Sequence, residues 1–269
     1  GVVGRVLRAI EHAVYRGSRR VFVISRSIEE KLLSRGVSPA KLSVIENWFS
    51  AGLLETVHRQ NPFSAEHRLD HRFVVLFAGN IGFSQGLETL LVEAAEALKE
   101  ESEVHFLVVG GGSGVPALRR AVEERGLSNT TLLEFQPKER VPEIYATADL
   151  CLVPLKKGFS EDSVPSKLLT IMASGRAVLA SVEAGSETAK LVRESQCGLV
   201  VQPEDSAGLA DAIMTLFRQR DSLAEMGRRG QQVVVGRYSK DGAVGRYAKA
   251  LRGIAEEADG LGVSPSQVA

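Results

Sequence analysis

The sequence predicts an α/β protein whose main part is a doubly wound parallel sheet. Six short segments are almost continuously apolar, and amphipathic segments separate them. Strands of that kind are buried on both faces, and their alternation with helices indicates a parallel sheet. The predicted strands are 73–78, 104–109, 131–135, 150–153, 177–180 and 198–201. The predicted helices between them are 86–99, 114–126, 140–147, 164–174 and 186–196.

The first 48 residues predict a separate and unfinished α/β layer. Their pattern gives a helix at 2–17, a strand at 20–25, a helix ended by Gly36 and a strand at 42–45. So few elements cannot bury both faces of a parallel sheet, so we expect something upstream to complete the layer. The basic side of helix 2–17 would either face the solvent or contact an anionic lipid surface, and exposure to solvent is the simpler interpretation.

Residues 50–71 are polar and predict an irregular linker between two domains. They contain His58, His67, Asp70 and His71, but the spacing of these side chains matches no metal-ligand pattern. We therefore expect no metal there. At the other end of the chain, helices are predicted at 205–218, 220–230 and about 239–258, followed by a disordered tail.

The composition of the chain is that of an ordinary globular protein. Of 269 residues, 44% are hydrophobic and 25% charged, which is ordinary for a globular protein. Lys plus Arg equal Asp plus Glu at 33 each, so no partnership with nucleic acid is indicated. Both cysteines, Cys151 and Cys197, lie in apolar strand-like contexts, which favours buried thiols and a cytoplasmic location. The sequence shows neither a signal peptide nor an apolar run of membrane-spanning length.

Ligands of such sheets bind outside the carboxyl ends of the strands. Two glycine-rich turns follow predicted strands there, and glycines let backbone amides approach a phosphate closely. The turns carry Gly79, Asn80, Gly82 and Gln85 in the first case and Gly110 to Gly114 in the second. Neither turn matches a dinucleotide fingerprint or a P-loop. A Lys156–Lys157 pair in a further loop would either bind a diphosphate or lie exposed on the surface.

The stretch 160–181 predicts a polar loop, a short helix and a buried strand. Ser163 is the expected N-cap, Pro165 fits the first turn, and Gly175 fits a left-handed helix end. Lys167, Thr170 and Ser174 would form one polar stripe on that helix. An anion site and an ordinary capped helix both explain this pattern. No grouping of nucleophile, base and acid appears, and His105 within a strand is expected to be structural.

Five segments together resemble group 1 (family 4) glycosyltransferases of the GT-B fold. They are FAGNIGFSQGLETLLVEAA, FLVVGGGSGVPALRR, ATADLCLVPLKKG, VPSKLLTIMASGRAVLAS and CGLVVQPEDSAGLADAI, in that order. The likeness is greatest to bacterial fucosyl- and N-acetylfucosaminyl-transferases of surface polysaccharides. It implies that 1–49 end an N-terminal acceptor domain, 50–71 link the domains, and 72–236 bind a nucleotide-sugar. A C-terminal helix at 237–258 and the tail 259–269 would follow.

The resemblance also implies site residues. Gly79, Asn80 and Gly82 would open the diphosphate loop, with Gln85 where many members have a lysine. Gly110 and Gly111 would flank the nucleotide, and the backbone of Gln136 and Pro137 would meet the base. The two glutamates of the family fall on Asp162 and Thr170, so Asp162 would hold donor-sugar hydroxyls and Thr170 the ribose. Lys167 would supply the cation at the diphosphate. The neighbouring donor contacts would be Ser163, Val164 and Ser166.

The resemblance implies a retaining transferase that uses a nucleotide diphosphate-sugar, UDP- or GDP-linked, with no further cofactor. The acceptor would be lipid-linked or a polysaccharide, and the enzyme would work in the cytoplasm or peripherally on the inner face of the plasma membrane. Two alternatives stay open. The chain could be a non-catalytic nucleotide-sugar-binding domain that needs a partner, or part of a GT-B sugar-nucleotide epimerase.

Overall fold

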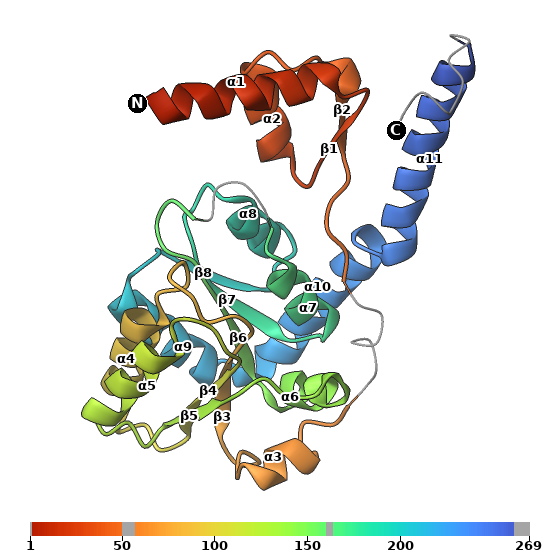
Figure 1. The fold of residues 1–269 in the computed structure, drawn as a ribbon. Coiled ribbons are helices and arrows are strands. Elements are labelled where there is room, and N and C mark those ends of the chain that lie inside the picture. The colour runs from red at the N-terminus through yellow and green to blue at the C-terminus, as the bar shows by residue number, and fades with distance from the viewer. Residues whose placement is uncertain (1, 50–56, 160–163, 261–269) are drawn as a thin grey trace. The chain divides into compact units, whose positions relative to one another are not determined.

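The computed structural model describes residues 2–49, 57–159 and 164–260, and the chain divides into two compact units (Figure 1). The smaller unit comprises residues 1–48 and 240–269, and the larger one comprises residues 49–239.

The larger unit is built on a six-stranded parallel sheet with the order β5-β4-β3-β6-β7-β8. The strands are β3 (Phe73–Ala78), β4 (Val104–Val109), β5 (Thr130–Leu133), β6 (Leu150–Pro154), β7 (Ala177–Ser181) and β8 (Gly198–Val201). The first strand lies between β4 and β6, so the chain winds outward from it in both directions. This is the predicted doubly wound sheet, and its topological switch point lies between β3 and β6.

Helices cover both faces of this sheet. One face is covered by α4 (Leu87–Ala97), α5 (Val115–Glu124) and α9 (Ser206–Arg218). The other is covered by α3 (Pro62–Glu66), α6 (Val141–Thr147), α7 (Ser166–Ala173), α8 (Glu187–Glu194) and α10 (Leu223–Arg237). Short 3-10 turns, η3 (Lys138–Arg140) and η4 (Arg220–Ser222), precede α6 and α10.

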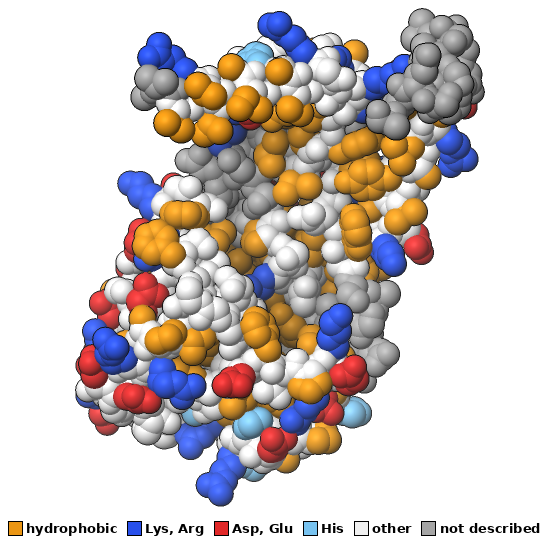
Figure 2. Space-filling model, viewed as in Figure 1, with side chains coloured by type: hydrophobic (Ala, Val, Ile, Leu, Met, Phe, Trp, Pro, Cys, Tyr) orange, Lys and Arg blue, Asp and Glu red, His pale blue; other side chains and the backbone are white. Residues whose placement is uncertain are grey.

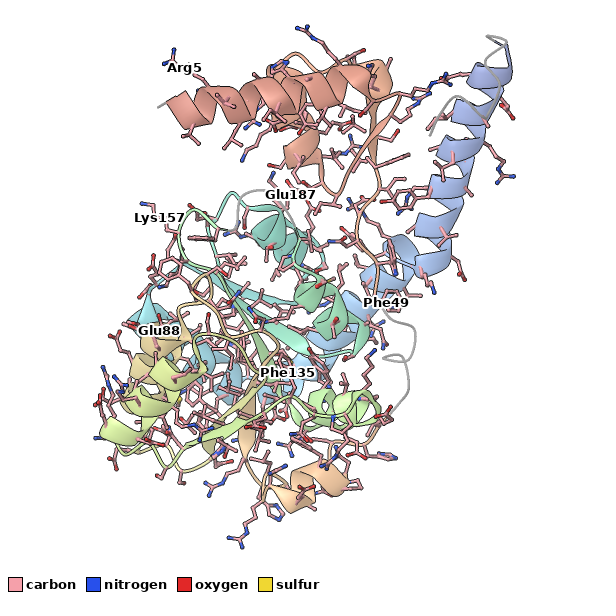
Figure 3. The ribbon with its side chains drawn as sticks, viewed as in Figure 1. Arg5, Phe49, Glu88, Phe135, Lys157 and Glu187 are labelled. Atoms are coloured by element: carbon pink, nitrogen blue, oxygen red, sulfur yellow. The ribbon has the colours of Figure 1, made fainter. Side chains whose placement is uncertain are left out.

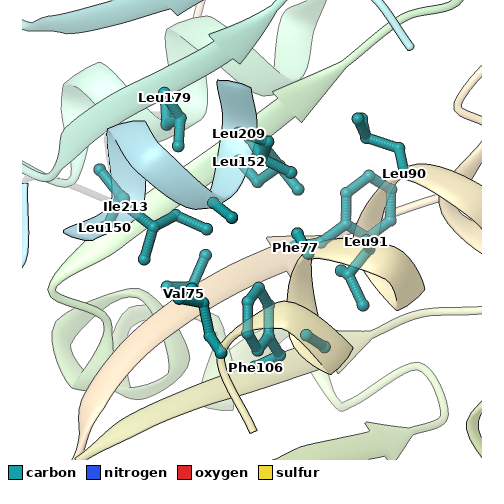
Figure 4. Close-up of a cluster of buried hydrophobic side chains, with 14 of the residues drawn as sticks. Val75, Phe77, Leu90, Leu91, Phe106, Leu150, Leu152, Leu179, Leu209 and Ile213 are labelled. Atoms are coloured by element: carbon teal, nitrogen blue, oxygen red, sulfur yellow. The ribbon is translucent and has the colours of Figure 1, made fainter. Parts of the chain in front are cut away.

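The sheet strands are apolar on both faces because each face supports a separate core. On the α4 side, Phe77 and Phe106 are fully buried among leucines of α4 and α9 (Figure 4). Burying one such side chain contributes about 1.5–3 kcal/mol. On the other side, Leu168, Leu169 and Met172 of α7 are buried against the same sheet. His105 is within β4, where its Nε2 lies 2.8 Å from Thr131 Oγ1 and burial lowers its pKa to about 4. It thus pairs with a side chain of the neighbouring strand.

Several predicted boundaries were wrong. The supposed linker contains α3, whose Asn61 cap accepts from the Phe63 and Ser64 amides. Strand β5 ends at Leu133, two residues early. Helix α7 begins at Ser166 with Pro165, not Ser163, at the cap position and no side-chain hydrogen bond from that cap, while Ser163 itself lies outside the described residues. Gly175 does end α7 in the left-handed region, with φ of 65°.

Arg59 and Asp149 join the predicted linker to the sheet. The guanidinium donates to both carboxylate oxygens of Asp149, at 2.9 and 2.7 Å, and to the carbonyls of Asp70 and Arg72. Asp149 also accepts from the amide of Val74, at 2.7 Å. The hydrogen bond with Asp149 raises the pKa of Arg59. The pair therefore connects residues before β3 with the starts of β3 and β6.

The smaller unit contains α1 (Val2–Gly17), β1 (Val21–Val23), α2 (Arg26–Ser34), η1 (Pro39–Lys41), β2 (Leu42–Val44) and α11 (Lys240–Gly260). Its two strands pair in parallel, and its core of buried residues consists of Val23, Leu32, Val37 and Leu42. Phe22 of β1 packs against Tyr247 of α11, with ring centroids 5.1 Å apart and the rings tilted by 58°. The apolar stripe of α1 is exposed, as Figure 2 shows along that helix. No helix in the described ranges is long and apolar enough to cross a membrane.

Asp149→Ala should lower the free energy of unfolding of the larger unit by about 1–3 kcal/mol, because it leaves Nε of Arg59 and the amide of Val74 without their acceptor. Urea denaturation followed by circular dichroism measures this change. Arg228→Ala, which breaks an exposed pair with Glu225, is the control and should change stability by less than about 0.5 kcal/mol. Equal stability of the two variants would refute a structural role for the Arg59–Asp149 pair.

Candidate functional site

The turns after β3 and β4 are joined by backbone hydrogen bonds at the carboxyl edge of the sheet. The Gly79 amide donates to Val109 O at 2.9 Å, the Ile81 amide to Gly111 O at 2.8 Å, and the Gly114 amide to Ile81 O at 2.9 Å. The two glycine-rich turns that the sequence predicts to be ligand loops are therefore one structural element. It lies beside the switch point between β3 and β6.

Glycine is required where these turns touch. Gly110 has φ of 156°, and a Cβ built on it would lie 1.9 Å from Gly79 O. At Gly112, with φ of 138°, a Cβ would lie 2.4 Å from Ile81 O. Both conformations and both distances exclude larger residues. The backbone is consequently bare along this edge, as close approach of an anion requires.

Lys167 extends from α7 to the first of these turns. A Cβ on Gly79 would lie 3.1 Å from Cε and 3.4 Å from Nζ of this lysine. Its Nζ also lies 3.4 Å from the centroid of the Phe77 ring. Burial lowers the pKa of Lys167 to about 7. Among the described residues no carboxylate pairs with this amine, so it is a largely buried cation whose only compensation there is an aromatic face.

Asn80 and Gln85, the other predicted polar residues of the first turn, make contacts within the glycine turns themselves. Asn80 lies between the turns, since its side-chain oxygen would be 2.7 Å from a Cβ on Gly112. The Oε1 of Gln85 accepts from the Gly82 amide at 2.9 Å, and its Nε2 donates to Ser84 Oγ at 2.9 Å. Both ends of the Gln85 side chain are thus used inside the turn, and it does not extend outward as a lysine would.

On α7, the polar stripe is present and its hydroxyls bond along the helix. Thr170 Oγ1 donates to Ser166 O at 3.1 Å, and Ser174 Oγ donates to Thr170 O at 2.9 Å. Thr170 is half-buried and lies outside the core, and Ser166 is exposed. Val164 packs on the core beneath α7. Asp162 and Ser163 lie outside the described residues.

The residues after β5 approach the second turn. Phe135, predicted to be the last strand residue, is instead 65% exposed, and its ring contacts Gly111, where a Cβ would lie 2.8 Å from Cε2 (Figure 3). Gln136 is half-buried and donates to Glu134 O, while Pro137 is exposed before η3. The polar run EFQPK, which cannot continue a buried strand, is the signal that could have placed Phe135 outside the sheet.

Lys156 is paired within the protein. Its Nζ lies 3.5 Å from Glu88 Oε1 and 4.1 Å from the centroid of Phe83, and its Cε lies against Gly86. Lys157 is exposed on the same loop (Figure 3). Lys156 therefore packs at the Gly86 end of the first turn, Lys157 is exposed to solvent, and Lys167 lies at the Gly79 end of that turn.

A hollow of about 760 Å³ lies away from these turns, at the amino edge of the sheet. It is bounded by residues that precede the strands, among them Arg59, Arg72, Asp149 and Arg176. Its charged side chains largely pair with one another or with backbone carbonyls. The chemistry predicted from the sequence lies at the opposite edge.

Comparison with known proteins decides the family. The sequence profile of the group 1 glycosyl transferases matches residues 72–219, which span the six-stranded sheet and the glycine turns. The chain belongs to the group 1 glycosyl transferases.

Among curated relatives, WcaI of Escherichia coli (strain K12), named as a colanic acid biosynthesis glycosyl transferase, is 30% identical over 79% of this chain and 53% of its own length. WbjE of Pseudomonas aeruginosa, named as a glycosyltransferase, is 27% identical over 88% of this chain and 58% of its own length. The chain thus spans just over half the length of these relatives.

Solved structures share the fold. Alr3699/HepE of Anabaena, in complex with UDP, superposes with a TM-score of 0.77 at 19% identity, over 92% of this chain and 67% of that one. The sucrose-phosphate synthase of Thermosynechococcus elongatus gives a TM-score of 0.73 at 21% identity, over 93% of this chain and 61% of that one. These likenesses show the arrangement of the elements, since their sequence identity is low.

Lys167→Met should raise the free energy of unfolding by about 1–3 kcal/mol at pH 6, because a largely buried charge that pairs with no carboxylate of the described residues is replaced by an apolar side chain of similar shape. The gain should shrink as pH rises from 7 toward 10.5. In that range the folded protein has released the proton while the unfolded chain still binds it, so wild-type stability rises with pH. Urea titrations at pH 6 and pH 9 measure both effects.

Lys156→Met is the matched control for this substitution. Its amine already has Glu88 and the Phe83 ring as partners, so the variant should gain no stability at either pH. A Lys167→Met protein as stable as the wild type at pH 6 would contradict a destabilising buried charge at Lys167.

Proposed function

We propose that this chain is the donor-binding half of a retaining glycosyltransferase, which transfers a sugar from a nucleotide diphosphate-sugar to a lipid-linked or polysaccharide acceptor. The observation that carries the proposal is the buried Lys167 amine beside the bare backbone of Gly79. A buried cation needs an anion, and the diphosphate of a nucleotide-sugar supplies one next to glycine turns that lead into helix N-termini.

Family membership gives the reaction class. In sugar transfer from a nucleotide-sugar, the leaving group is a nucleoside diphosphate whose negative charge grows as the bond to the sugar breaks. Groups arranged in advance to receive that charge supply much of the catalysis. In this chain they are the Lys167 amine, the backbone at Gly79 and Gly110, and the start of α4.

The remaining site residues follow from the family motif. We assign Asn80, Gly82, Gln85 and Gly111 to the walls of the diphosphate and nucleotide site. Gln136 and Pro137 take the base, Thr170 the ribose, and Asp162 the donor-sugar hydroxyls. Ser163, Val164 and Ser166 complete the start of the α7 segment. This assignment makes residues 72–236 the donor domain, 1–49 the end of the acceptor domain, and 237–258 a closing helix.

The setting is cell-surface glycan synthesis. Its support is the name of WcaI, which refers to colanic acid biosynthesis, and a likeness to fucosyl- and N-acetylfucosaminyl-transferases of surface polysaccharides. We place the enzyme in the cytoplasm, in peripheral contact with the inner face of the plasma membrane. Exposed apolar residues of α1, with Arg5 and Arg8 on the same helix, support that contact.

Lys167→Met should weaken binding of UDP or GDP by about 1–3 kcal/mol, the cost of losing a charge-assisted contact. Calorimetry measures this change. Wild-type affinity should fall as pH rises from 7 to 9, because binding needs the protonated amine and the pKa of free Lys167 is about 7. The variant should lose that part of the pH dependence, and Lys157→Met should bind as the wild type does. A pH profile shared by all three proteins would exclude Lys167 from the diphosphate site.

Turnover separates the proposed enzyme from a binding module. With a matched UDP- or GDP-sugar, this chain should release the nucleoside diphosphate slowly by hydrolysis, and Asp162→Asn should slow release while leaving diphosphate affinity within about twofold. Chromatography of the nucleotide products gives the rates. Tight diphosphate binding without any release would instead favour a non-catalytic domain that needs a partner, and conversion of the sugar-nucleotide to its epimer would favour an epimerase.

A further inference from the structure

Two phenylalanines stand exposed at the rim of the glycine turns. Phe83, in the β3–α4 turn, is 70% exposed, and Phe159, in the loop after β6, is 53% exposed. Their ring centroids lie 6.0 Å apart at an interplanar angle of 72°. The two rings come from segments more than 70 residues apart in the sequence, so the tertiary fold brings them together. We call them the aromatic pair.

The loops that carry the aromatic pair are fixed. The Lys156 amide donates to Ser84 O at 2.8 Å, and its Nζ lies over the Phe83 ring. The Phe159 amide donates to Lys156 O at 3.1 Å, and the Gly158 amide donates to Glu183 Oε2 at 3.1 Å. Exposed aromatic side chains that pack on each other between hydrogen-bonded loops indicate a contact surface.

The surroundings of the aromatic pair limit what can bind there. The neighbours along the chain are Gly82, Ser84 and Gly158, and the carboxylates of Glu183 and Glu204 accept from the amides of the same loop. A lipid surface needs a broader apolar area than two rings with a polar border. A pyranose ring suits it, because one face presents C–H groups that stack on aromatic rings while the hydroxyls at its edge reach polar groups.

The aromatic pair and Lys167 contact different parts of the first turn. Lys156, which lies over the Phe83 ring, contacts Gly86 and Glu88 at the end of the turn and the start of α4. Lys167 reaches Gly79 at the beginning of the turn, and its Nζ lies over the Phe77 ring. A donor anchored by its diphosphate at Gly79 therefore leaves the aromatic pair available to a second sugar.

We propose that Phe83 and Phe159 form a stacking platform for a sugar ring of the acceptor glycan. The inference rests on the proposed function, since it assigns the diphosphate to the Gly79–Lys167 side. It adds an acceptor contact made by the donor domain, and it makes the acceptor a glycan whose sugar is recognised by its C–H face.

Saturation-transfer NMR on the whole chain tests the platform, with the methyl glycosides of glucose, galactose, mannose and fucose as probes. At least one glycoside should receive saturation at its ring C–H protons from aromatic protons. In the double variant F83A/F159A its affinity should fall about fivefold or more, as expected for lost aromatic contacts. F83Y/F159Y keeps the ring faces and should bind as the wild type does. Val235→Ala, at another exposed apolar residue of the same unit, is the matched control and should change nothing.

Calorimetry with UDP and sedimentation with anionic vesicles complete the test. The double alanine variant should bind UDP with unchanged affinity and should bind vesicles no differently from the wild type. The platform is refuted if no glycoside binds the wild type, if the variant binds glycosides equally well, if it loses UDP affinity, or if it loses vesicle binding. Glycoside binding that depends on the aromatic pair in a wild-type chain that binds neither UDP nor GDP would refute the proposed donor function alone.

Discussion

The turns after β3 and β4 meet backbone to backbone, and the whole carboxyl edge of the larger unit depends on that contact. At Gly110 there is no room for a Cβ, because the carbonyl of Gly79 occupies its place. The hydrogen bonds of Gly79, Ile81 and Gly114 then fix the two turns as one element. The turns follow β3 and β4 beside the switch point of a doubly wound sheet, which is where such sheets bind their ligands.

This edge of the sheet carries an amine that pairs with no carboxylate of the described residues. Lys167 is largely buried, and the aromatic face of Phe77 only partly replaces its hydration. Burial disfavours the charged form of such a group, which is why its pKa lies near neutrality. Binding sites often retain side chains that would be better replaced for stability alone. Lys156 shows the contrast, since Glu88 and Phe83 already compensate its charge.

The two edges of the sheet differ in their use of charge. At the amino edge, Arg59 and Asp149 satisfy each other and the backbone around them, and connect the segment before β3 to β6. At the carboxyl edge, Lys167 has no such partner among the described residues, and Phe83 and Phe159 stand exposed. The polar groups at the amino edge are thus paired with one another, whereas the carboxyl edge presents an amine without a carboxylate partner among the described residues and two exposed aromatic rings.

Local pattern alone determined the strands from β3 to β8, the helices between them, the doubly wound class and the glycine turns. These features follow from apolar periodicity and from turn residues, which act over a few neighbours in the chain. The family likeness also came from short segments, and the match over residues 72–219 confirmed it. Helix α3 was missed because its cap, Asn61, lies among polar residues that resemble a linker.

Only the tertiary structure decided which side chains act together. In the folded protein Lys167 lies beside Gly79, and Lys156 pairs with Glu88. Gln85 accepts a hydrogen bond within its own turn, and Phe83 packs against Phe159. The tertiary structure also showed that Arg59 belongs with Asp149, 90 residues later in the chain. Most of these contacts depend on how strands and helices far apart in the sequence pack, and that packing sets distance and burial. The sequence around a charged, amide or aromatic side chain therefore does not predict which distant residue it will contact.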